Sequence, residues 1–318
     1  MNESPRFEPT AILKDLWQNA GMLVVFIFLF VVLSVAVRNF LSPINMVNLA
    51  LSVSSVGMVS CTMLMCLLAG DFDLSVEATV ACSGVIAAVL IALTGSKALG
   101  ITAALAAGAL VGLVNGVVIA KLRINALITT LATMQIVRGV GFIVCRGIPR
   151  PIMLPSLGEA TPLGIPTPVW ITAACFLTFG LLLNKTVFGR NALAIGGNRE
   201  AARLAGIPVV RTKIIIFTLQ GLMAAFTGIV VAAKMQLAHP RPIDGFSLNV
   251  ISACVLGGVS LSGGVGTITG ALVGVLIMGT VENAMELCRI EYFYKYVIRG
   301  SILLAAVLFD QLKQRRTT

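Results

Sequence analysis

Three acidic side chains stand close together in an otherwise apolar part of the chain. Asp71, Asp73 and Glu77 lie in the segment GDFDLSVE, between two long apolar runs. Carboxylates in such a place are costly unless they reach water, a helix cap or an ionic partner. One interpretation is structural: Asp73 or Ser75 caps a helix whose first turn holds Glu77, where the helix dipole favours an anion. The other is a role in a substrate path or gate, and the residues alone leave both open.

Other polar side chains interrupt the apolar runs further along the chain, namely Asn115, Gln135, Arg138, Gln220, Glu282, Asn283, Glu286 and Arg299. Each must face protein or a water-filled cavity, because lipid offers no hydrogen bonds. Gln135 and Arg138 share a helix face at their spacing, as do Glu282 and Glu286. Pairing of Arg138 or Arg299 with one of these two glutamates is one explanation. Lining a solute path is the other.

Motifs for catalysis or nucleotide binding are missing from the sequence. No GxxxxGK[ST] segment is present, so the chain cannot cradle ATP phosphates in the P-loop manner. The single histidine, His239, lies among prolines, and the 7 cysteines form no CxxC pair. We therefore expect no metal site, no cofactor bound by this chain and no catalytic residues. The sequence predicts that the protein is not an enzyme.

The composition shows which solvent surrounds these elements. Hydrophobic residues make up 58% of the 318 residues and charged residues 11%, against about 25% charged in soluble domains. Too few charges remain to cover a water-facing surface, so the chain is predicted to lie in lipid. The formal net charge of +10 is spread in small clusters between apolar runs. It therefore indicates membrane topology rather than nucleic-acid binding.

Long apolar stretches predict how the chain crosses the membrane. A bilayer core needs about 20 apolar residues for each helix. Suitable stretches, with few or no charges, cover residues 22–37, 39–70, 78–96, 98–120, 124–145, 160–184, 214–233, 245–281 and 296–310. Residues 245–281 are too long for one span and contain clustered glycines, so we expect two elements joined by a glycine-rich break. The prediction is an all-α polytopic membrane protein with about ten transmembrane helices, in a single domain covering residues 1–318.

Lysine and arginine in short loops predict the orientation. The segment 184–213 is rich in bases and contains Glu200 as its single acid, so it should be cytoplasmic. With ten spans, the N-terminal segment 1–20 and the tail 311–318 fall on the same side. The segments 146–168 and 234–247 then form loops on the opposite side.

The basic segment also predicts a short helix. After a turn, Asn198 can cap a helix that begins with Glu200, and Gly206 can end it before Pro208. Alanine and leucine on one side and arginine on another suit docking into a groove of a partner protein. An ordinary surface helix is the alternative, and the residues alone do not separate the two.

Two segments of the chain resemble each other. LAGDFDLSV at 68–76 and LGGVSLSGG at 256–264 both end an apolar run with glycine and continue with Leu-Ser. Many transporters contain two related halves, so an internal repeat is one explanation. Chance similarity among residues common in membranes is the other.

Several longer motifs together resemble one known family, the inner-membrane permeases of bacterial sugar ABC importers of the ribose, xylose and arabinose group, with the arabinose branch most similar. The resemblance covers the chain from about Trp17 to Arg316. It is carried by GDFDLSV at 70–76, LVNGVVIAKLRINALITTLATMQIVRG at 113–139, FGRNALAIGGNREAARLAGIPVVRTKIIIF at 188–217, VISACVLGGVSLSGGVGTI at 250–268 and GTVENAM at 279–285. Glu77 and the segment 146–165 depart from the family pattern.

The resemblance implies a transport subunit of the bacterial inner membrane that imports a pentose, most closely L-arabinose, using ATP. Expected partners are a separate ATPase subunit that binds ATP and Mg, a periplasmic sugar-binding protein, and a second permease copy in a homodimer. The segment 184–213 would contain the ATPase-coupling helix, with Gly197, Asn198, Glu200, Ala201, Ala202, Gly206 and Ile207 as its motif residues. Along the substrate path we expect Asp73, Asn115, Gln135 and Asn283. An ion-coupled secondary sugar transporter is the alternative.

Overall fold

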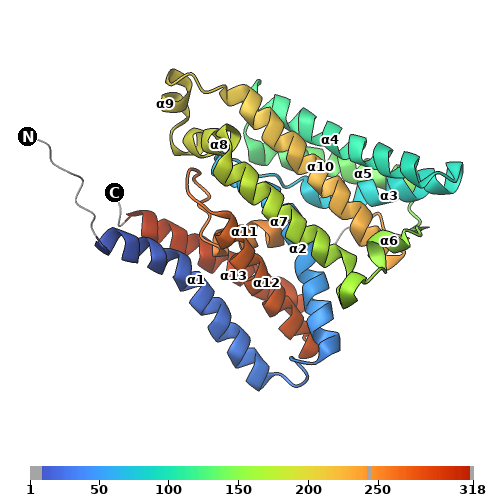
Figure 1. Cartoon of the computed structure of the whole chain (residues 1–318). Helices are drawn as coiled ribbons and strands as arrows, with labels where there is room; N and C mark the ends of the chain where they lie inside the picture. Colours follow the sequence, from blue (N-terminus) through green and yellow to red (C-terminus); the bar gives the residue numbers. More distant parts are fainter. Residues whose placement is uncertain (1–8, 242–244, 316–318) are drawn as a thin grey trace, which may run out of the picture.

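The architecture is a bundle of long helices with very little strand (Figure 1). The computed structural model describes residues 9–241 and 245–315, with side chains placed for 21–241 and 245–308. In the described part, the helices are α1 (Pro9–Ala36), α2 (Pro43–Leu68), α3 (Val76–Thr94), α4 (Lys97–Ala120), α5 (Ala126–Cys145), α6 (Pro155–Gly158), α7 (Thr167–Lys185), α8 (Val187–Gly197), α9 (Arg199–Leu204), α10 (Val209–Met235), α11 (Phe246–Leu256), α12 (Ile268–Leu287) and α13 (Tyr292–Arg315).

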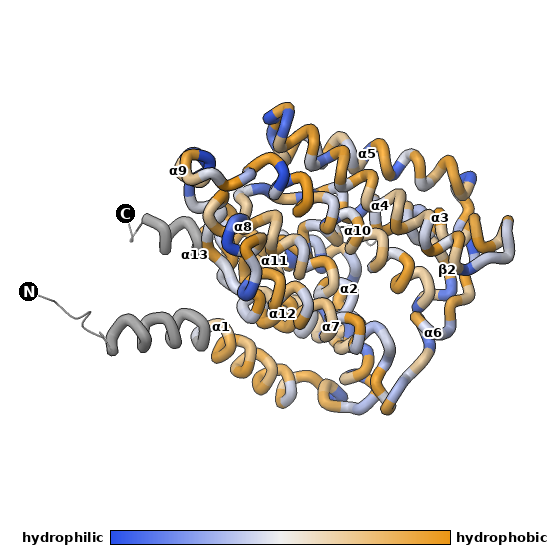
Figure 2. Tube along the Cα trace, turned by 45° about the horizontal axis from the view of Figure 1, so that its top comes forward, coloured by the Kyte–Doolittle hydropathy of each residue, from blue (hydrophilic) through white to orange (hydrophobic). Residues whose placement is uncertain are grey.

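Among the described residues, seven helices are long and apolar enough to cross a membrane, by length and composition: α2, α3, α4, α5, α7, α10 and α12. The apolar part of α1, Gly21–Ala36, and α11 are shorter. Hydrophobic residues run along most of the trace, whereas hydrophilic ones gather around α8 and α9 (Figure 2). The prediction of an all-α polytopic membrane protein is confirmed. The predicted terminal segments 1–20 and 311–318 lie outside the residues whose side chains are described.

Polar caps fix where the long helices begin. The side chains of Ser42, Ser96, Asn125 and Thr267 each accept a hydrogen bond from a backbone N–H in the first turn of α2, α4, α5 and α12, respectively. A capping oxygen satisfies a donor that the helix itself leaves free. In lipid such a free donor is especially costly. These four spans therefore start where the sequence supplies Ser, Thr or Asn.

Glycines bring α4 and α10 into close contact at the centre of the bundle. A Cβ atom at Gly112 would collide with the carbonyl oxygen of Phe217, and one at Gly221 would collide with that of Gly108. Because lipid tails are as apolar as the helices, close van der Waals packing over small residues drives helix association in membranes. These two helices therefore form a tightly packed pair, against which α2 and α3 also pack.

The expected division of residues 245–281 is confirmed. Helix α11 ends at Leu256, α12 begins at Ile268, and the segment between them contains Gly258, Gly263 and Gly264 with positive φ. A short helix η1 (Pro162–Gly164) and the strands β1 (Arg150–Pro151) and β2 (Leu237–Ala238) lie within the segments predicted as loops. The two strands pair antiparallel, with Arg150 opposite Ala238.

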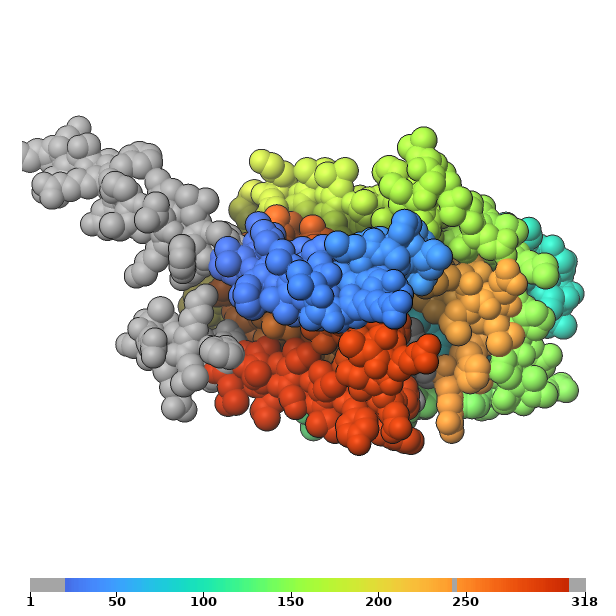
Figure 3. Space-filling model, turned by 90° about the horizontal axis from the view of Figure 1, so that it is seen from below, coloured from blue at the N-terminus to red at the C-terminus, as the bar shows by residue number. Residues whose placement is uncertain are grey.

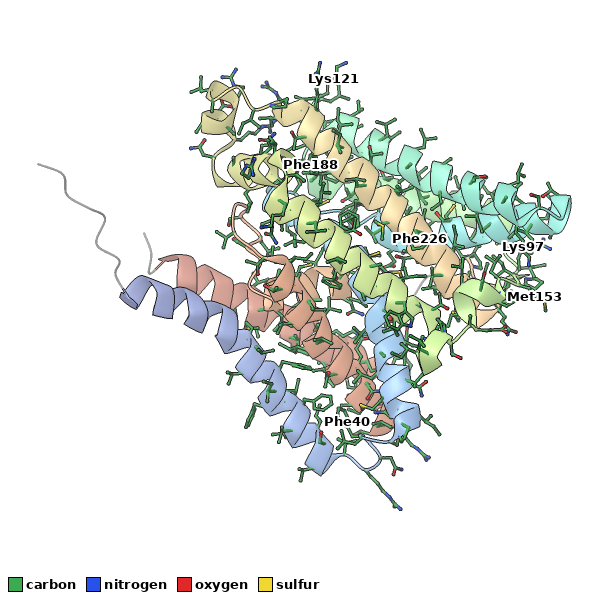
Figure 4. The ribbon with its side chains drawn as sticks, in the orientation of Figure 1. Phe40, Lys97, Lys121, Met153, Phe188 and Phe226 are labelled. Atoms are coloured by element: carbon green, nitrogen blue, oxygen red, sulfur yellow. The ribbon has the colours of Figure 1, made fainter. Side chains whose placement is uncertain are left out.

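The bundle has two distinct ends. Lys121 and Phe188 lie at the end that carries α8 and α9, and Lys97, Met153 and Phe40 lie at the opposite end (Figure 4). Seen from below, the N-terminal helix lies beside the C-terminal helices (Figure 3). The buried Phe40 ring packs edge-on against Phe30, with centroids 5.3 Å apart, and so holds the end of α1 near the start of α2.

Candidate functional site

A two-helix segment, residues 187–207, projects at one end of the bundle and is called the coupling segment below (Figure 1). Asn198 ends α8 and caps α9, accepting a hydrogen bond from the Ala201 N–H at 2.9 Å. Gly206 follows α9 at φ +80°, and the Ile207 N–H donates to the Ala202 carbonyl at 3.0 Å. Both caps agree with the sequence prediction, and the helix begins at Arg199, one residue earlier than expected.

The residues before Asn198 form a helix, so the prediction of a turn there is wrong. Helix α8 covers Val187–Gly197, with Thr186 accepting a hydrogen bond from the Gly189 N–H at 3.3 Å. The glycines suggested a break, but two of them serve packing. A Cβ at Gly189 would collide with the Leu183 backbone, and one at Gly196 would collide with the Leu68 carbonyl oxygen. These glycines allow α8 to lie directly on neighbouring backbone.

The faces of α9 separate the predicted coupling residues into two groups. Ala202 is buried against the rest of the chain, so it is a packing residue of the coupling segment. Glu200 and Arg203 are exposed and paired to each other at 3.0 Å. Leu204 is 81% exposed. The sequence predicted alanine and leucine together on the docking side of this helix, but the structure buries Ala202 and exposes Leu204 on the same face as Glu200.

The remaining coupling residues lie around the same helix. Gly197, Asn198, Ala201 and Gly206 are exposed, and Ile207 is half-buried. The exposed face of α9 thus presents the apolar Leu204 among polar and small residues, the pattern on which the docking prediction depends.

Polar side chains form a connected cluster around the start of α3. Asp73 Oδ1 accepts hydrogen bonds from the Ser75 N–H at 2.8 Å and from the Ser75 hydroxyl at 2.6 Å. Asn115 on α4 donates to the Ser75 hydroxyl at 2.9 Å and accepts from the Thr133 hydroxyl on α5 at 2.7 Å. We call Asp73, Ser75, Asn115 and Thr133, with the neighbouring Glu77, Gln135 and Arg138, the polar cluster.

Glu77 joins three helices within this cluster. Arg138 on α5 donates to it at 2.9 Å, and the hydroxyl of Ser247 on α11 donates at 3.3 Å. Glu77 lies in the first turn of α3, and Ser75 occupies the N-cap position, as predicted, although the Ser75 side chain makes no capping bond. Of the two arginines considered as partners for Glu282 or Glu286, Arg138 therefore pairs with Glu77 instead.

Arg299 makes the pair expected of it, with Glu282 at 3.1 Å. Asn249 on α11 also donates to this glutamate, at 2.8 Å. These contacts connect α11, α12 and α13. They give the intramembrane charges in this part of the bundle a structural explanation.

The structure brings two of the four predicted path residues, Asp73 and Asn115, together. Asp73 and Asn115 are linked through Ser75, and Gln135 is exposed beside Arg138, which approaches its side-chain oxygen at 3.5 Å. Asn283 lies elsewhere: its amide exchanges hydrogen bonds of 2.9 and 2.8 Å with that of Asn45. This reciprocal pair connects α12 to the start of α2. Among the described residues, no group of three or more His, Cys, Asp or Glu side chains is placed to hold a metal ion.

A bundle of apolar spans with a polar cluster among its helices and an exposed, doubly capped helix at one end is the arrangement of a membrane transport protein. Comparison with known families agrees with this class. Residues 45–307 match the family model described as "Branched-chain amino acid transport system / permease component". The match covers most of the chain, so the protein belongs to this permease family and is a transport component rather than an enzyme.

Individual relatives are similar over nearly the whole chain. The L-arabinose transport system permease protein AraH of Escherichia coli (strain K12) is 58% identical over 303 residues, which is 94% of this chain and 92% of the relative. The L-arabinose ABC transporter permease protein AraH of Azospirillum brasilense is 52% identical, over 97% and 93%. The ribose import permease protein RbsC of Escherichia coli (strain K12) is 36% identical, over 92% and 93%. No solved structure matches.

These relatives decide between the two transporter classes left open by the sequence. One of these relatives is named as an ABC transporter permease. An ion-coupled secondary transporter, by contrast, would take its energy from an ion gradient and need no ATPase subunit. The chain is therefore an ABC-type permease, a multi-pass protein of the inner membrane.

Proposed function

We propose that this chain carries L-arabinose across the bacterial inner membrane as the permease subunit of an ATP-driven importer. The observation that supports this substrate most directly is the 58% identity to the E. coli L-arabinose permease, over 94% of the chain. Identity to a ribose permease is much lower, at 36%. A pentose whose hydroxyl groups are arranged as in arabinose is therefore the favoured substrate over ribose.

The coupling segment is proposed as the docking site of a separate ATPase subunit. Glu200, Arg203 and Leu204 are exposed on α9 and offer it a charged pair and an apolar side chain. ATP and Mg would bind on that ATPase, since this chain has no P-loop. Docking of this kind requires α9 and the segment 184–213 to lie in the cytoplasm, and we propose the same side for both chain termini. A periplasmic sugar-binding protein would then deliver the sugar at the opposite end.

The outer face of α5 supports a homodimer with the sugar path between its two copies. Only 22% of the residues in the α5 span are buried within the chain. Along this helix Gln135 is exposed and Arg138 is half-buried. Such side chains cannot face lipid without a large cost. A water-filled path against a second copy would satisfy them, and the amide of Gln135 would offer hydrogen bonds to sugar hydroxyl groups.

Reconstitution tests this function directly. The permease is placed in proteoliposomes with its ATPase subunit and binding protein, and uptake of radiolabelled L-arabinose is measured with ATP, without ATP, and with a proton gradient alone. We expect uptake only with ATP, and stronger competition from unlabelled L-arabinose than from D-ribose. Uptake driven by a proton gradient in the absence of ATP would overturn the mechanism. Preference for D-ribose would overturn the substrate.

A further inference from the structure

Three backbone segments that are distant in sequence meet at the end of α2. The Leu68 carbonyl oxygen accepts a hydrogen bond from the Gly264 N–H at 3.0 Å. A Cβ atom at Gly196, near the end of α8, would collide with that same oxygen. A Cβ atom at Gly264 would lie 2.8 Å from the Cα of Gly197. The end of α8 therefore touches both the end of α2 and the glycine-rich break before α12, with no side chain between the backbones.

We call residues 68–71, the last residue of α2 and the three that follow it, the relay turn. Its last residue, Asp71, accepts a hydrogen bond from the ammonium group of Lys213 on α10 at 2.7 Å. The two side chains are 13% and 6% exposed. A buried ion pair of this kind holds its partners together strongly, because separating them leaves an uncompensated charge away from water.

Helix α9 lies in the chain between these two contacts. Gly196 precedes α9 and packs on Leu68, while Lys213 follows α9 and binds Asp71. Only Asn198 separates α8 from α9, and only 205–208 separate α9 from α10. A displacement of α9 would therefore reach the relay turn from both sides, through a rigid backbone contact and through an ion pair.

The relay turn is followed in the chain by residues of the polar cluster. Asp73 and Ser75 follow Asp71 in the chain, and Asn115 binds the Ser75 hydroxyl at 2.9 Å. Residues 73–76, which lead from the relay turn into α3, are all buried, so the surrounding packing limits how far this segment can move independently. The two segments that resemble each other in sequence, 68–76 and 256–264, also touch here, with the Cα of Gly70 3.0 Å from a Cβ placed at Gly263.

From these contacts we infer that Asp71 and Lys213 are positioning residues for energy coupling, which transmit movement of α9 through the relay turn to the polar cluster. This inference rests on the proposed function of α9 as the ATPase-docking helix. It adds a specific route: the pair couples the coupling segment to the start of α3. It predicts that breaking the pair separates ATP hydrolysis from sugar transport without releasing the ATPase.

The test uses the complete complex of permease, ATPase and binding protein in proteoliposomes. Asp71→Asn and Lys213→Met each break the pair, and the double variant Asp71→Lys with Lys213→Asp restores it in reverse. Arabinose uptake and ATP hydrolysis are measured on the same preparation, and co-purification reports assembly. Glu282→Gln is the matched control, because it breaks another buried ion pair, with Arg299, between α12 and α13.

We expect each single variant to lower the arabinose transported per ATP by about tenfold while the ATPase still co-purifies, a size typical of coupling between sites. The reversed pair should recover most of this ratio, and Glu282→Gln should keep the wild-type ratio even if it unfolds at a lower temperature. A wild-type ratio in both single variants would overturn the inference. So would loss of the ATPase from both, or a reversed pair that assembles but stays uncoupled. Failure of the wild-type complex to transport arabinose would instead count against the proposed substrate.

Discussion

Arg138 on α5 donates a hydrogen bond to Glu77 on α3 across 2.9 Å, and this contact connects the exposed face of α5 to the polar cluster. The Glu77 side chain is 8% exposed and that of Arg138 32%. Replacing Arg138 with Met should therefore leave the buried Glu77 side chain without its ion-pair partner. Because one side of the pair reaches solvent, we expect a loss of about 1–3 kcal/mol in the free energy of unfolding.

Denaturant unfolding of the purified permease in detergent would measure this loss. Lys295→Met is the control, since its partner Glu286 is 66% exposed and lies 3.8 Å away. Such open pairs contribute about 0–1 kcal/mol. Equal losses in the two variants would contradict the importance of the Arg138 and Glu77 pair.

The cap at Asn198 gives a second prediction. Asn198→Ala removes the acceptor for the Ala201 N–H, and the loss of such a cap costs about 1 kcal/mol of helix stability. Helix α9 is only 6 residues long, so it should fray and dock the ATPase less well. Asn198→Asp keeps the acceptor and should keep docking. Co-purification of the ATPase with the two variants checks this. Equal recovery of the ATPase would contradict a role of the Asn198 cap in docking.

Leu204 and Ala202 should respond differently to substitution, because they occupy opposite faces of α9. Leu204→Glu replaces an 81% exposed side chain. It should reduce ATPase binding and uptake while the melting temperature of the isolated permease stays unchanged. Ala202→Leu places a larger group in a buried site, where overpacking costs about 1–3 kcal/mol. If Leu204→Glu supports normal uptake, this face of α9 is not the docking surface.

The two remaining path candidates also separate by experiment. Gln135 is exposed beside Arg138, so Gln135→Ala should raise the sugar concentration needed for half-maximal uptake with little change in stability. Asn283→Ala leaves Asn45 with unmatched buried groups, and should cost about 1–3 kcal/mol of stability without changing which sugar is preferred. Uptake kinetics and unfolding curves on both variants make the comparison. A change of sugar preference in Asn283→Ala would show that Asn283 lines the sugar path after all.

What the sequence predicted well depends on local signals. The apolar runs, the break in 245–281 and the caps of α9 at Asn198 and Gly206 all follow from hydropathy and from the chemistry of neighbouring residues. Pairing between distant residues is different, because one arginine and several acids allow many partners. The Asp71 and Lys213 pair joins residues 142 positions apart, and the sequence contained no signal for it.

Helix α8 shows a second reason for failure. Glycine near position 196 indicates either a break in the helix or a close approach of two backbones, and only the neighbour decides which. The neighbour here is the Leu68 carbonyl, which lies 128 positions before Gly196 in the chain. The exposed face of α9 was also partly missed, because the burial of Ala202 depends on how α9 is placed against the bundle.

The close packing of α4 on α10 gives the last prediction. A Cβ at Gly112 would collide with the Phe217 carbonyl oxygen, which is backbone and cannot turn aside. Gly112→Ala should therefore push the two helices apart, with a loss of at least about 1–3 kcal/mol. Gly21→Ala is the control: Gly21 is also helical, but a Cβ there meets nothing within 4 Å. That variant should be up to about 1 kcal/mol more stable to unfolding, because alanine has a higher helix propensity than glycine. Unfolding curves for both variants measure the difference, and the same stability for Gly112→Ala as for Gly21→Ala would show that α4 and α10 do not depend on glycine contact.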